Sequence, residues 1–267
     1  MRNSFVVAAL LLGALFDTSS PLLGHTEEER RTDLVQELSA FFEKDWVLDI
    51  FNHQDLCAGR EIPIERLRGG WPELERQVLH EDSVARGVAF FEEHYFTLTG
   101  TSYAHRDKTN TLPFVTVAIL RIESDLGENR TGTPVIRTLF NKYHRATDGP
   151  GGNARRRYIL EREIVPFMRM AAQSDWDVCG ILGTRAAAFG YPHFIPESLR
   201  LSADGDGDGT IDLMWSVADA VASIGNYLEK TGWHRSPKQS VFRYNPDWRY
   251  VHIVLSYAKA LERAVKE

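Results

Sequence analysis

The spacing of hydrophobic positions predicts a mainly helical protein. From about residue 25 onward, apolar side chains recur every three or four residues over long stretches, whereas the alternating pattern of strands is scarce. Proline, glycine and capping residues indicate where the helices begin and end. We expect helices over 25–52, from Ser83 through Tyr95, between Pro113 and Gly127, from Thr133-Pro134 onward, over 155–173, from Ser216 to Gly232, and over 248–265. The predicted fold class is therefore mainly α, with at most a small sheet or hairpin.

Residues 1–24 have a different pattern, which is typical of a secretory signal peptide. Arg2 precedes an apolar run from Phe5 to Phe16, and a polar stretch with small residues follows. The run is shorter than the roughly 20 residues that a helix needs to cross a bilayer, so we expect no transmembrane anchor. His25 stands where a lipoprotein box would have cysteine, so we expect no lipid anchor. These features predict an exported protein, periplasmic or extracellular; a buried N-terminal helix is the alternative.

Composition and charge narrow the functional classes. The 31 Lys and Arg residues are outnumbered by 37 Asp and Glu, and the net charge of -6 argues against a general nucleic-acid binder. The chain lacks a Walker loop, the dinucleotide-binding glycine pattern and an HExxH helix, so we expect no organic cofactor. Cys57 and Cys179 could pair in an exported protein or remain buried thiols in a cytosolic one. The sequence leaves both possibilities open.

An acidic loop over 204–212 is the most specific local motif. Its sequence, DGDGDGTID, has the D-x-D-x-D-G spacing of an EF-hand calcium loop, with Gly209 at the sharp bend. The expected ligands within the loop are Asp204, Asp206, Asp208, the carbonyl of Thr210, and Asp212. The motif therefore predicts a Ca²⁺ site, with a solvated acidic turn as the alternative.

The last ligand position of this loop departs from the EF-hand pattern. Trp215 stands at position 12, where the bidentate glutamate belongs. Asp219, at the start of the following helix, is the available substitute, although it could instead be the residue that caps that helix. Because the chain has one such loop and no paired partner, we expect a structural calcium site over 204–219 and not a sensor.

Glu123 is the leading candidate for a catalytic acid. It lies in the last turn of the apolar helix FVTVAILRIESDLG, which we expect to be buried. Burial and the negative end of the helix dipole both favour the protonated carboxyl, which is the form that a general acid needs for cleavage of a glycosidic bond. An exposed glutamate paired with Arg121 or Arg130 is the alternative.

Six stretches between residues 110 and 263 form an ordered set. They are RIESDLGENRTGTP with Glu123, RRRYILEREI with Arg155 and Arg156, GTRAAAFGYPHFIPES with Thr184 and His193, the DGDGDGTIDLMW loop, SVADAVASIGNYL with Tyr227, and FRYNPDWRYV with Tyr244, Asn245 and Tyr250. In this order they resemble the lytic murein transglycosylases of the B type. The resemblance implies an α+β lysozyme-like catalytic region over 109–267, which an N-terminal helical region over 25–108 precedes.

The resemblance also implies a role for individual residues. Glu123 falls on the family's catalytic glutamate. The implied substrate-binding residues are Arg155, Arg156, Thr184, His193, Tyr227, Tyr244, Asn245 and Tyr250. His193 stands where the family has a substrate-binding glutamine, and Thr184 where it has serine. A packed core histidine and a solvated arginine face are the alternatives for His193 and for the arginine pair.

The implied activity is cleavage of the β-1,4 bond between N-acetylmuramic acid and N-acetylglucosamine in peptidoglycan glycan strands. Glu123 would protonate the leaving oxygen, and the substrate's own acetamido group would act as the internal nucleophile. A 1,6-anhydro ring would then close without water. A muramidase-type hydrolase and a non-catalytic peptidoglycan-binding protein on the same fold are the alternatives.

Overall fold

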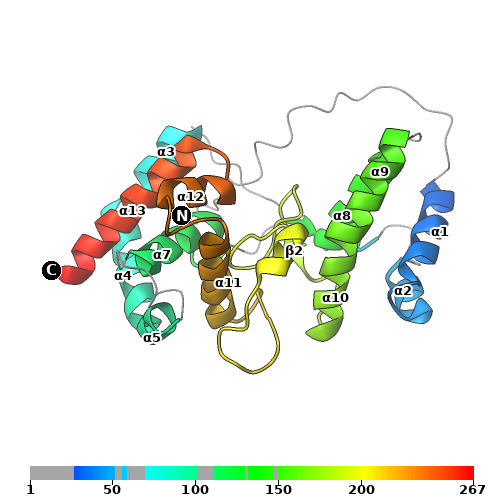
Figure 1. Ribbon diagram of the computed structural model, residues 1–267, viewed down its shortest axis with the longest axis horizontal. Helices are drawn as coiled ribbons and strands as arrows, with labels where there is room; N and C mark the ends of the chain where they lie inside the picture. The colour runs from blue at the N-terminus through cyan, green and yellow to red at the C-terminus, as the bar shows by residue number, and fades with distance from the viewer. Residues whose placement is uncertain are drawn as a thin grey trace.

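The helices of the protein fall into two groups, at the two ends of an elongated molecule (Figure 1). The computed structural model describes residues 27–51, 56–58, 60, 70–101, 111–129, 132–146 and 150–267. The first group consists of α3 (Gly70–Val78), α4 (Glu81–Glu93), α5 (Tyr95–Thr99), α7 (Leu112–Ser124), α11 (Val217–Lys230), α12 (Pro237–Tyr244) and α13 (Trp248–Lys266). The second consists of α1 (Glu27–Leu38), α2 (Lys44–Phe51), α8 (Val135–Arg145), α9 (Pro150–Ile159), the π-helical η1 (Leu160–Ile164) and α10 (Val165–Gln173). The expected signal segment 1–24 lies outside the described residues.

Helix α7 is the centre of the first group. All of its residues are buried, and α4, α11 and α13 pack around it. Its sequence has apolar side chains on nearly every face, so it needs protein on all sides. Pro113 occupies the first turn, where the missing N–H would have had no partner within the helix. The expected buried helix is therefore confirmed.

The end of α7 is built differently from the prediction. The helix ends one residue beyond Glu123, before the predicted stop at Gly127, because Asp125 adopts the left-handed conformation with a φ of 54° and forms the C-cap. The Asp125 carboxylate is paired with Arg121 at 2.7 Å and with Arg86 at 3.0 Å. These charge-assisted contacts offset the cost of the strained backbone.

The helix predicted over 25–52 is divided into α1 and α2. The hydroxyl of Ser39 donates to the carbonyl of Val35 at 2.7 Å, in the kind of local bond that competes with continuation of a helix. The break allows both helices to bury side chains in the same core. These include Leu34 and Leu38 of α1 and Val47 of α2.

Two prolines account for further differences. Thr133-Pro134 forms the short strand β1 instead of opening a helix; β1 pairs antiparallel with β2 (Leu182–Gly183), and α8 begins at the next residue. The helix predicted over 155–173 begins earlier and contains the π-helical turn η1 between α9 and α10. Pro166, in the first turn of α10, has no N–H to bond to the preceding turn, so the helical ladder changes there.

The two groups have separate hydrophobic cores. Helices α3, α4 and α5 share a core with α7 and α13, although they precede the boundary predicted at residue 108. Helices α1 and α2 share the other core with α8, η1 and α10. The short 3₁₀ helix η2 (Pro196–Leu201) packs against α10 and η1 of the second group and against α11 of the first. Tyr244 borders both cores, so the residues around it lie where the two groups meet.

A disulfide joins Cys57 to Cys179, with Cα atoms 5.3 Å apart. It ties the segment after α2 to the segment after α10. Within the same helix group, a guanidinium nitrogen of Arg31 donates to the carbonyl of Phe51 at 3.0 Å, and the phenol of Tyr143 donates to Glu37 at 3.1 Å. The pairing that the sequence left open is therefore present.

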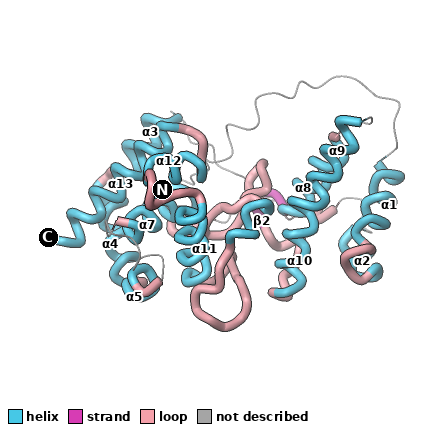
Figure 2. The backbone as a smooth tube through the Cα atoms, viewed as in Figure 1, coloured by secondary structure: helices cyan, strands magenta, loops and turns pink. Residues whose placement is uncertain are grey.

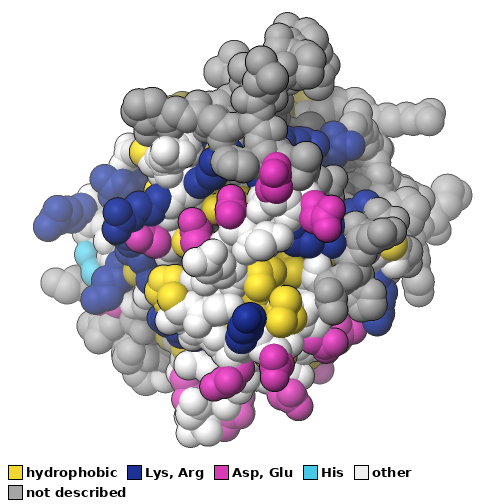
Figure 3. All heavy atoms as spheres, turned by 90° about the vertical axis from the view of Figure 1, so that its right-hand side faces the viewer, with side chains coloured by type: hydrophobic (Ala, Val, Ile, Leu, Met, Phe, Trp, Pro, Cys, Tyr) yellow, Lys and Arg dark blue, Asp and Glu magenta, His cyan; other side chains and the backbone are white. Residues whose placement is uncertain are grey.

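The end of the molecule that carries α1 and α2 has a mixed surface. Basic and acidic side chains are interspersed across this face around a small hydrophobic area (Figure 3). Among the described residues on this face, both signs of charge are mixed, so they form no single-sign patch that would attract a polyanion. Within the described ranges, no helix combines the length and the apolar character that crossing a membrane requires.

Candidate active site

The carboxyl group of Glu123 lies between two side chains from distant parts of the chain. Glu123 is 2% exposed. The phenol of Tyr250, in the first turn of α13, donates a hydrogen bond to Oε1 at 2.8 Å. Nδ1 of His193 lies 3.4 Å from Oε2, and neither of these two atoms has a hydrogen-bond partner within the described part of the chain. The exposed helix-end alternative for Glu123 is therefore wrong.

A tight turn holds His193 in place. Its backbone N–H donates to the carbonyl of Gly190 at 3.2 Å, and its φ of 48° lies in the left-handed region, where histidine is among the enriched non-glycine residues. The carbonyl of Tyr191 accepts a hydrogen bond from the hydroxyl of Ser124 at 2.8 Å. The N–H of Tyr191 donates to the carbonyl of Leu213 at 2.9 Å. The turn is thus attached both to the end of α7 and to the chain that leaves the acidic loop.

Tyr227 and Tyr244 form an aromatic wall at the junction of the two cores. Their ring centroids are 4.9 Å apart in an edge-on arrangement, and Phe194 packs 5.6 Å from the first and 5.9 Å from the second. The hydroxyl of Tyr244 donates to the carbonyl of Pro192 at 2.5 Å, and that of Tyr227 donates to the carbonyl of Arg243 at 2.7 Å. Tyr244 therefore connects α12 to the turn that carries His193.

The tyrosines of the site remain neutral near neutral pH. Burial is the main cause that raises the pKa of Tyr244 and Tyr250 well above the usual value, and the neighbouring charge of Glu123 raises both pKa values further. Burial also raises the pKa of Tyr227. All three phenols therefore keep the proton with which they donate hydrogen bonds.

Asn245 presents a buried donor directly after the tyrosine wall. The residue is 4% exposed, and its Nδ2 has no hydrogen-bond partner among the residues that the structure describes. It forms the C-cap of α12. Leaving a buried amide donor unpaired costs about 1–3 kcal/mol. A ligand acceptor placed at Nδ2 would recover that cost.

Thr184 supports the segment before the His193 turn. It is 2% exposed, and its hydroxyl accepts hydrogen bonds from the backbone N–H groups of Ala186 and Ala188, both at 3.2 Å. Between them, Ala187 adopts a φ of 66°. The Thr184 hydroxyl is thus directed at its own loop.

The predicted arginine pair lies apart from Glu123. Both residues belong to α9, which stands in the second helix group, whereas α7 stands in the first (Figure 1). Arg155 is exposed, with its guanidinium 5.3 Å from the ring centre of Tyr158. Arg156 is half-buried and donates to the carbonyl of Ala146 at 3.0 Å. The structure therefore brings Tyr250 and His193 to Glu123, but not the arginines.

The acidic loop projects from the middle of the molecule, before α11 (Figure 2). Gly207 and Gly209 have φ values of 80° and 89°, and their N–H groups donate to the carboxylate of Asp204 at 2.6 and 2.9 Å. These backbone bonds lower the pKa of Asp204. Asp208 accepts a hydrogen bond from the N–H of Thr210 at 2.7 Å. The loop is thus folded around its own carboxylates.

Asp219, in the first turn of α11, holds the acidic loop through its carboxylate. It is 1% exposed, and its two oxygens accept hydrogen bonds from the N–H groups of Gly205 and Asp212, both at 2.7 Å. The N-cap of α11 is Ser216, whose hydroxyl accepts from the N–H of Asp219 at 3.2 Å. The alternative in which Asp219 is the capping residue is therefore wrong.

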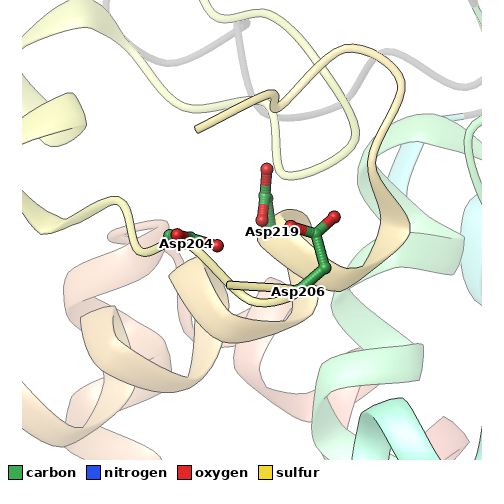
Figure 4. A group of neighbouring side chains, drawn as sticks. All are labelled: Asp204, Asp206 and Asp219. Atoms are coloured by element: carbon green, nitrogen blue, oxygen red, sulfur yellow. The ribbon is translucent and has the colours of Figure 1, made fainter. Parts of the chain in front are cut away.

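Three carboxylates of this loop converge. Oxygens of Asp204, Asp206 and Asp219 lie within 4.8 Å of one another (Figure 4). Two oxygens that bind one Ca²⁺ at 2.3–2.6 Å are at most about 5 Å apart, so this spacing fits the ion. Burial, followed by the charges of Asp206 and Asp204, raises the pKa of Asp219 against its two backbone hydrogen bonds. Asp212 accepts two backbone N–H bonds, at 2.8 and 3.0 Å.

Comparison with known proteins identifies the family. The model of the transglycosylase SLT domain matches residues 58–259. The chain belongs to this family. It is 27% identical over 216 residues to the membrane-bound lytic murein transglycosylase B of Escherichia coli (strain K12), an alignment that covers 79% of this chain and 55% of that protein. The chain therefore spans about half the length of this curated relative.

Solved structures of lytic transglycosylases share the fold of this SLT-domain protein. The Escherichia coli enzyme SLT35 in complex with calcium superimposes with a TM-score of 0.70 at 18% identity, covering 89% of this chain and 94% of that one. SltB3 from Pseudomonas aeruginosa in complex with NAG-NAM-pentapeptide gives a TM-score of 0.69 at 20% identity, covering 90% and 80%. The predicted mainly α, lysozyme-like fold is confirmed.

Sequence reasoning missed a set of buried, hydrogen-bonded polar residues that includes Arg121, two residues before Glu123 in α7. Arg121 is 4% exposed, and its Nε donates to the hydroxyl of Ser83 at 3.0 Å. The carbonyl of Ser83 in turn accepts from the phenol of Tyr257 at 2.8 Å. The available signal was an arginine inside an otherwise apolar helix, because a buried guanidinium requires a charged or polar partner. Asp125, four residues later in the sequence, was the candidate partner.

Proposed function

We propose that this protein is a lytic transglycosylase that cleaves the β-1,4 bond between N-acetylmuramic acid and N-acetylglucosamine in peptidoglycan. The observation that carries the proposal is the buried carboxyl of Glu123, to which Tyr250 donates a hydrogen bond. Membership of the transglycosylase SLT domain family supports it. So do the relative named a lytic murein transglycosylase and the SltB3 complex with NAG-NAM-pentapeptide.

Glu123 is the general acid of the proposed reaction. Its protonated carboxyl donates the proton to the glycosidic oxygen as the bond from that oxygen to C1 of N-acetylmuramic acid breaks. The hydrogen bond from Tyr250 fixes Oε1 and therefore the direction in which the carboxyl points. A preset orientation lowers the barrier because the acid does not need to be ordered at the moment of reaction.

The substrate supplies the nucleophile. The polar groups at the two oxygens of Glu123 are a phenol and an imidazole, whereas a retaining mechanism with two carboxyls places the second about 5–5.5 Å away. In the substrate-assisted path, the acetamido oxygen of N-acetylmuramic acid bonds to C1 as the leaving group departs. The C6 hydroxyl then replaces it at C1 and returns its proton to Glu123, which closes the 1,6-anhydro ring.

The remaining site residues bind the glycan in this account. The rings of Tyr227 and Tyr244 flank the sugar rings, and Nδ2 of Asn245 donates to a substrate carbonyl. His193 and Tyr250 border the reacting bond through Glu123, and Thr184 shapes the adjacent loop. Because α9 stands apart from α7, Arg155 and Arg156 meet carboxylates of the peptide stems away from the scissile bond.

The acidic loop binds one structural Ca²⁺ in this proposal. The ligands are Asp204, Asp206, Asp208, the carbonyl of Thr210, Asp212 and Asp219. The convergence of three carboxylates within 4.8 Å supports it, as does the SLT35 structure in complex with calcium. The ion would fix the loop against α11, and with it the carbonyl of Leu213 that holds the His193 turn.

The protein acts outside the cytoplasm in this account. Residues 1–24 serve as the export signal, which delivers the enzyme to the periplasm or the cell exterior, where peptidoglycan lies. The disulfide between Cys57 and Cys179 supports an oxidising compartment.

Digestion of purified peptidoglycan tests the function. The wild-type protein and Glu123→Gln, which retains the size of the side chain, are compared by mass spectrometry of the released muropeptides, with circular dichroism as the folding control. We expect 1,6-anhydro products, each one water lighter than the hydrolytic product, and none from Glu123→Gln. Reducing ends would establish a hydrolase instead, and binding to peptidoglycan without digestion would establish the non-catalytic alternative.

A further inference from the structure

The contact between His193 and Glu123 joins two buried titratable groups. The His193 side chain is 9% exposed and that of Glu123 is 2% exposed, with 3.4 Å between Nδ1 and Oε2. Neither atom has a hydrogen-bond partner among the described residues. Each atom is therefore positioned to form a hydrogen bond with the other. The left-handed turn at His193 holds this arrangement at a backbone cost that few side chains tolerate.

Such a pair shares its protons. A neutral imidazole accepts a hydrogen bond from the protonated carboxyl, whereas an imidazolium donates one to the carboxylate. In both arrangements Nδ1 and Oε2 share one dissociable proton, and the two charges cancel or are both absent. The charge of one group therefore decides the charge of the other. A charge on one group alone would be buried without compensation, which is costly.

We propose that His193 is a positioning residue that sets the fraction of molecules in which Glu123 can act as an acid: the neutral imidazole leaves the proton on Glu123, and the imidazolium holds Glu123 as a carboxylate. This control rests on the proposed function, in which Glu123 donates the proton to the leaving oxygen. It assigns to His193 an action on the acid itself, besides any contact with the sugar. Glutamine at this position could hydrogen-bond Oε2 but could not take up the proton.

The other groups near the pair do not change charge in the same range. Tyr250 of α13, Tyr244 of α12 and Tyr227 of α11 are the facing titratable groups, and their raised pKa values keep them neutral. On α7, Arg121 and Asp125 neutralise each other as an ion pair at 2.7 Å. The more distant charges of Arg200, Arg243 and Glu197 act on Tyr227. Among the described residues that face Glu123, the imidazole of His193 is therefore the group whose protonation bears on the proposal.

A rate measurement follows from this control. In the wild type, the form with an imidazolium and a carboxylate competes with the productive form, in which the proton is on Glu123. Because the two forms hold the same number of protons, their ratio does not change with pH. His193→Gln removes the competing form, so the plateau of kcat/KM for peptidoglycan cleavage should rise and its high-pH limb should move to lower pH, since Glu123 alone then holds the last proton. The rise of the plateau and the movement of the limb follow from the same ratio of the two forms, so a tenfold rise corresponds to a movement of about one pH unit.

The test combines this pH profile with NMR of the imidazole. The ¹⁵N resonances of His193 are titrated in the full-length wild type and in Glu123→Gln, and we expect the midpoint to be lower in Glu123→Gln, because the carboxylate that stabilises the imidazolium is gone. His252→Gln is the matched control for the pH profile, because His252 also faces a glutamate, Glu75 at 3.1 Å, but is exposed on α13. We expect the limb to move in His193→Gln and to stay in His252→Gln.

Two results would overturn the proposal. One is the same His193 midpoint with and without the Glu123 carboxyl. The other is a His193→Gln profile that is lower at every pH but keeps its limbs, which would indicate a merely structural role. Absence of glycan cleavage by the wild type would instead contradict the proposed function, and the NMR titration would still decide whether the two groups are coupled.

Discussion

The phenol of Tyr250 and the carboxyl of Glu123 are joined by a hydrogen bond of 2.8 Å across 127 residues of sequence. The helices that carry them, α13 and α7, pack directly against each other in the first core. The position of the proposed acid is therefore set by the packing of two buried helices. The imidazole at its other oxygen comes from a turn that hydrogen bonds attach to the same helix end.

Tyr250→Phe should reduce activity much more than it reduces stability. The ring and its packing remain, but Oε1 of Glu123 loses a donor that is worth about 1–3 kcal/mol. Since each 1.36 kcal/mol is tenfold in rate, we expect kcat to fall about 10- to 100-fold. Release of muropeptides measures the rate, and urea unfolding measures the stability.

Tyr257→Phe is the matched control for this variant. Tyr257 lies in the same helix, is buried, and also donates one hydrogen bond of 2.8 Å, but to the carbonyl of Ser83. Its removal should cost similar stability and leave kcat close to that of the wild type. Equal losses of activity in both variants would show that Tyr250 acts only through the stability of the helix.

Calcium should raise the melting temperature, and EDTA should lower it. Binding to the folded state stabilises it by about 2.7 kcal/mol when the ion is present at 100 times its Kd, which corresponds to roughly 5–10 °C for a chain of this size. Asp206→Asn removes one of the three converging charges and should abolish most of the calcium-dependent difference. Glu92→Gln, at an exposed position of α4, is the control. Identical melting with calcium and with EDTA would rule out the site.

Loss of the disulfide should destabilise the second helix group. The bond between Cys57 and Cys179 closes a segment with a sequence separation of 122, and removal of a native disulfide typically costs about 2–5 kcal/mol. The double variant with alanine at both positions should therefore unfold at lower urea. A reductant should destabilise the wild type to the same extent and leave the double variant unaffected; a reductant effect on the double variant would point to another cause.

His144 should make the protein less stable in acid. Burial is the main cause that lowers its pKa to about 4, and Arg30, Arg31 and Arg156 lower it further. The unfolded chain takes up this proton near pH 6.5 and the folded protein near pH 4, so the unfolded state binds more protons in between. Stability is therefore lost as the pH falls through this window.

The His144→Leu variant tests that pH dependence. The free energy of unfolding should fall less in the variant than in the wild type between pH 7.5 and pH 5, as measured in urea. His252→Leu, which removes an exposed histidine, should retain the wild-type dependence. The same acid-induced loss in His144→Leu and the wild type would show that other groups carry it.

Much of the framework was predictable from local sequence because it depends on local physics. The apolar faces between Pro113 and Glu123 require a buried helix, and no distant residue is needed to infer it. The carboxylates of the acidic loop follow each other at a spacing that brings them together through two glycine bends. The short helices α3 and α12 were not predicted, because segments of that length depend mainly on tertiary packing.

The details around Glu123 depend on residues far away in the chain. Asp125 can cap α7 in a left-handed conformation because Arg86, 39 residues earlier, pairs with it. Gly127 was expected to stop the helix, but its role is to admit the ring of Tyr191, which would lie 1.9 Å from a Cβ at this position. No local pattern reveals this contact, nor the approach of His193, two residues after Tyr191, to Glu123.

Digestion of purified peptidoglycan in water enriched in oxygen-18 tests the central claim most directly. If the C6 hydroxyl of N-acetylmuramic acid replaces the leaving group, the new bond at C1 contains substrate oxygen. The account therefore predicts 1,6-anhydro products without oxygen-18 from the wild type, and no products from Glu123→Gln. Oxygen-18 at C1 of the released N-acetylmuramic acid would show that water completes the reaction and would contradict the account.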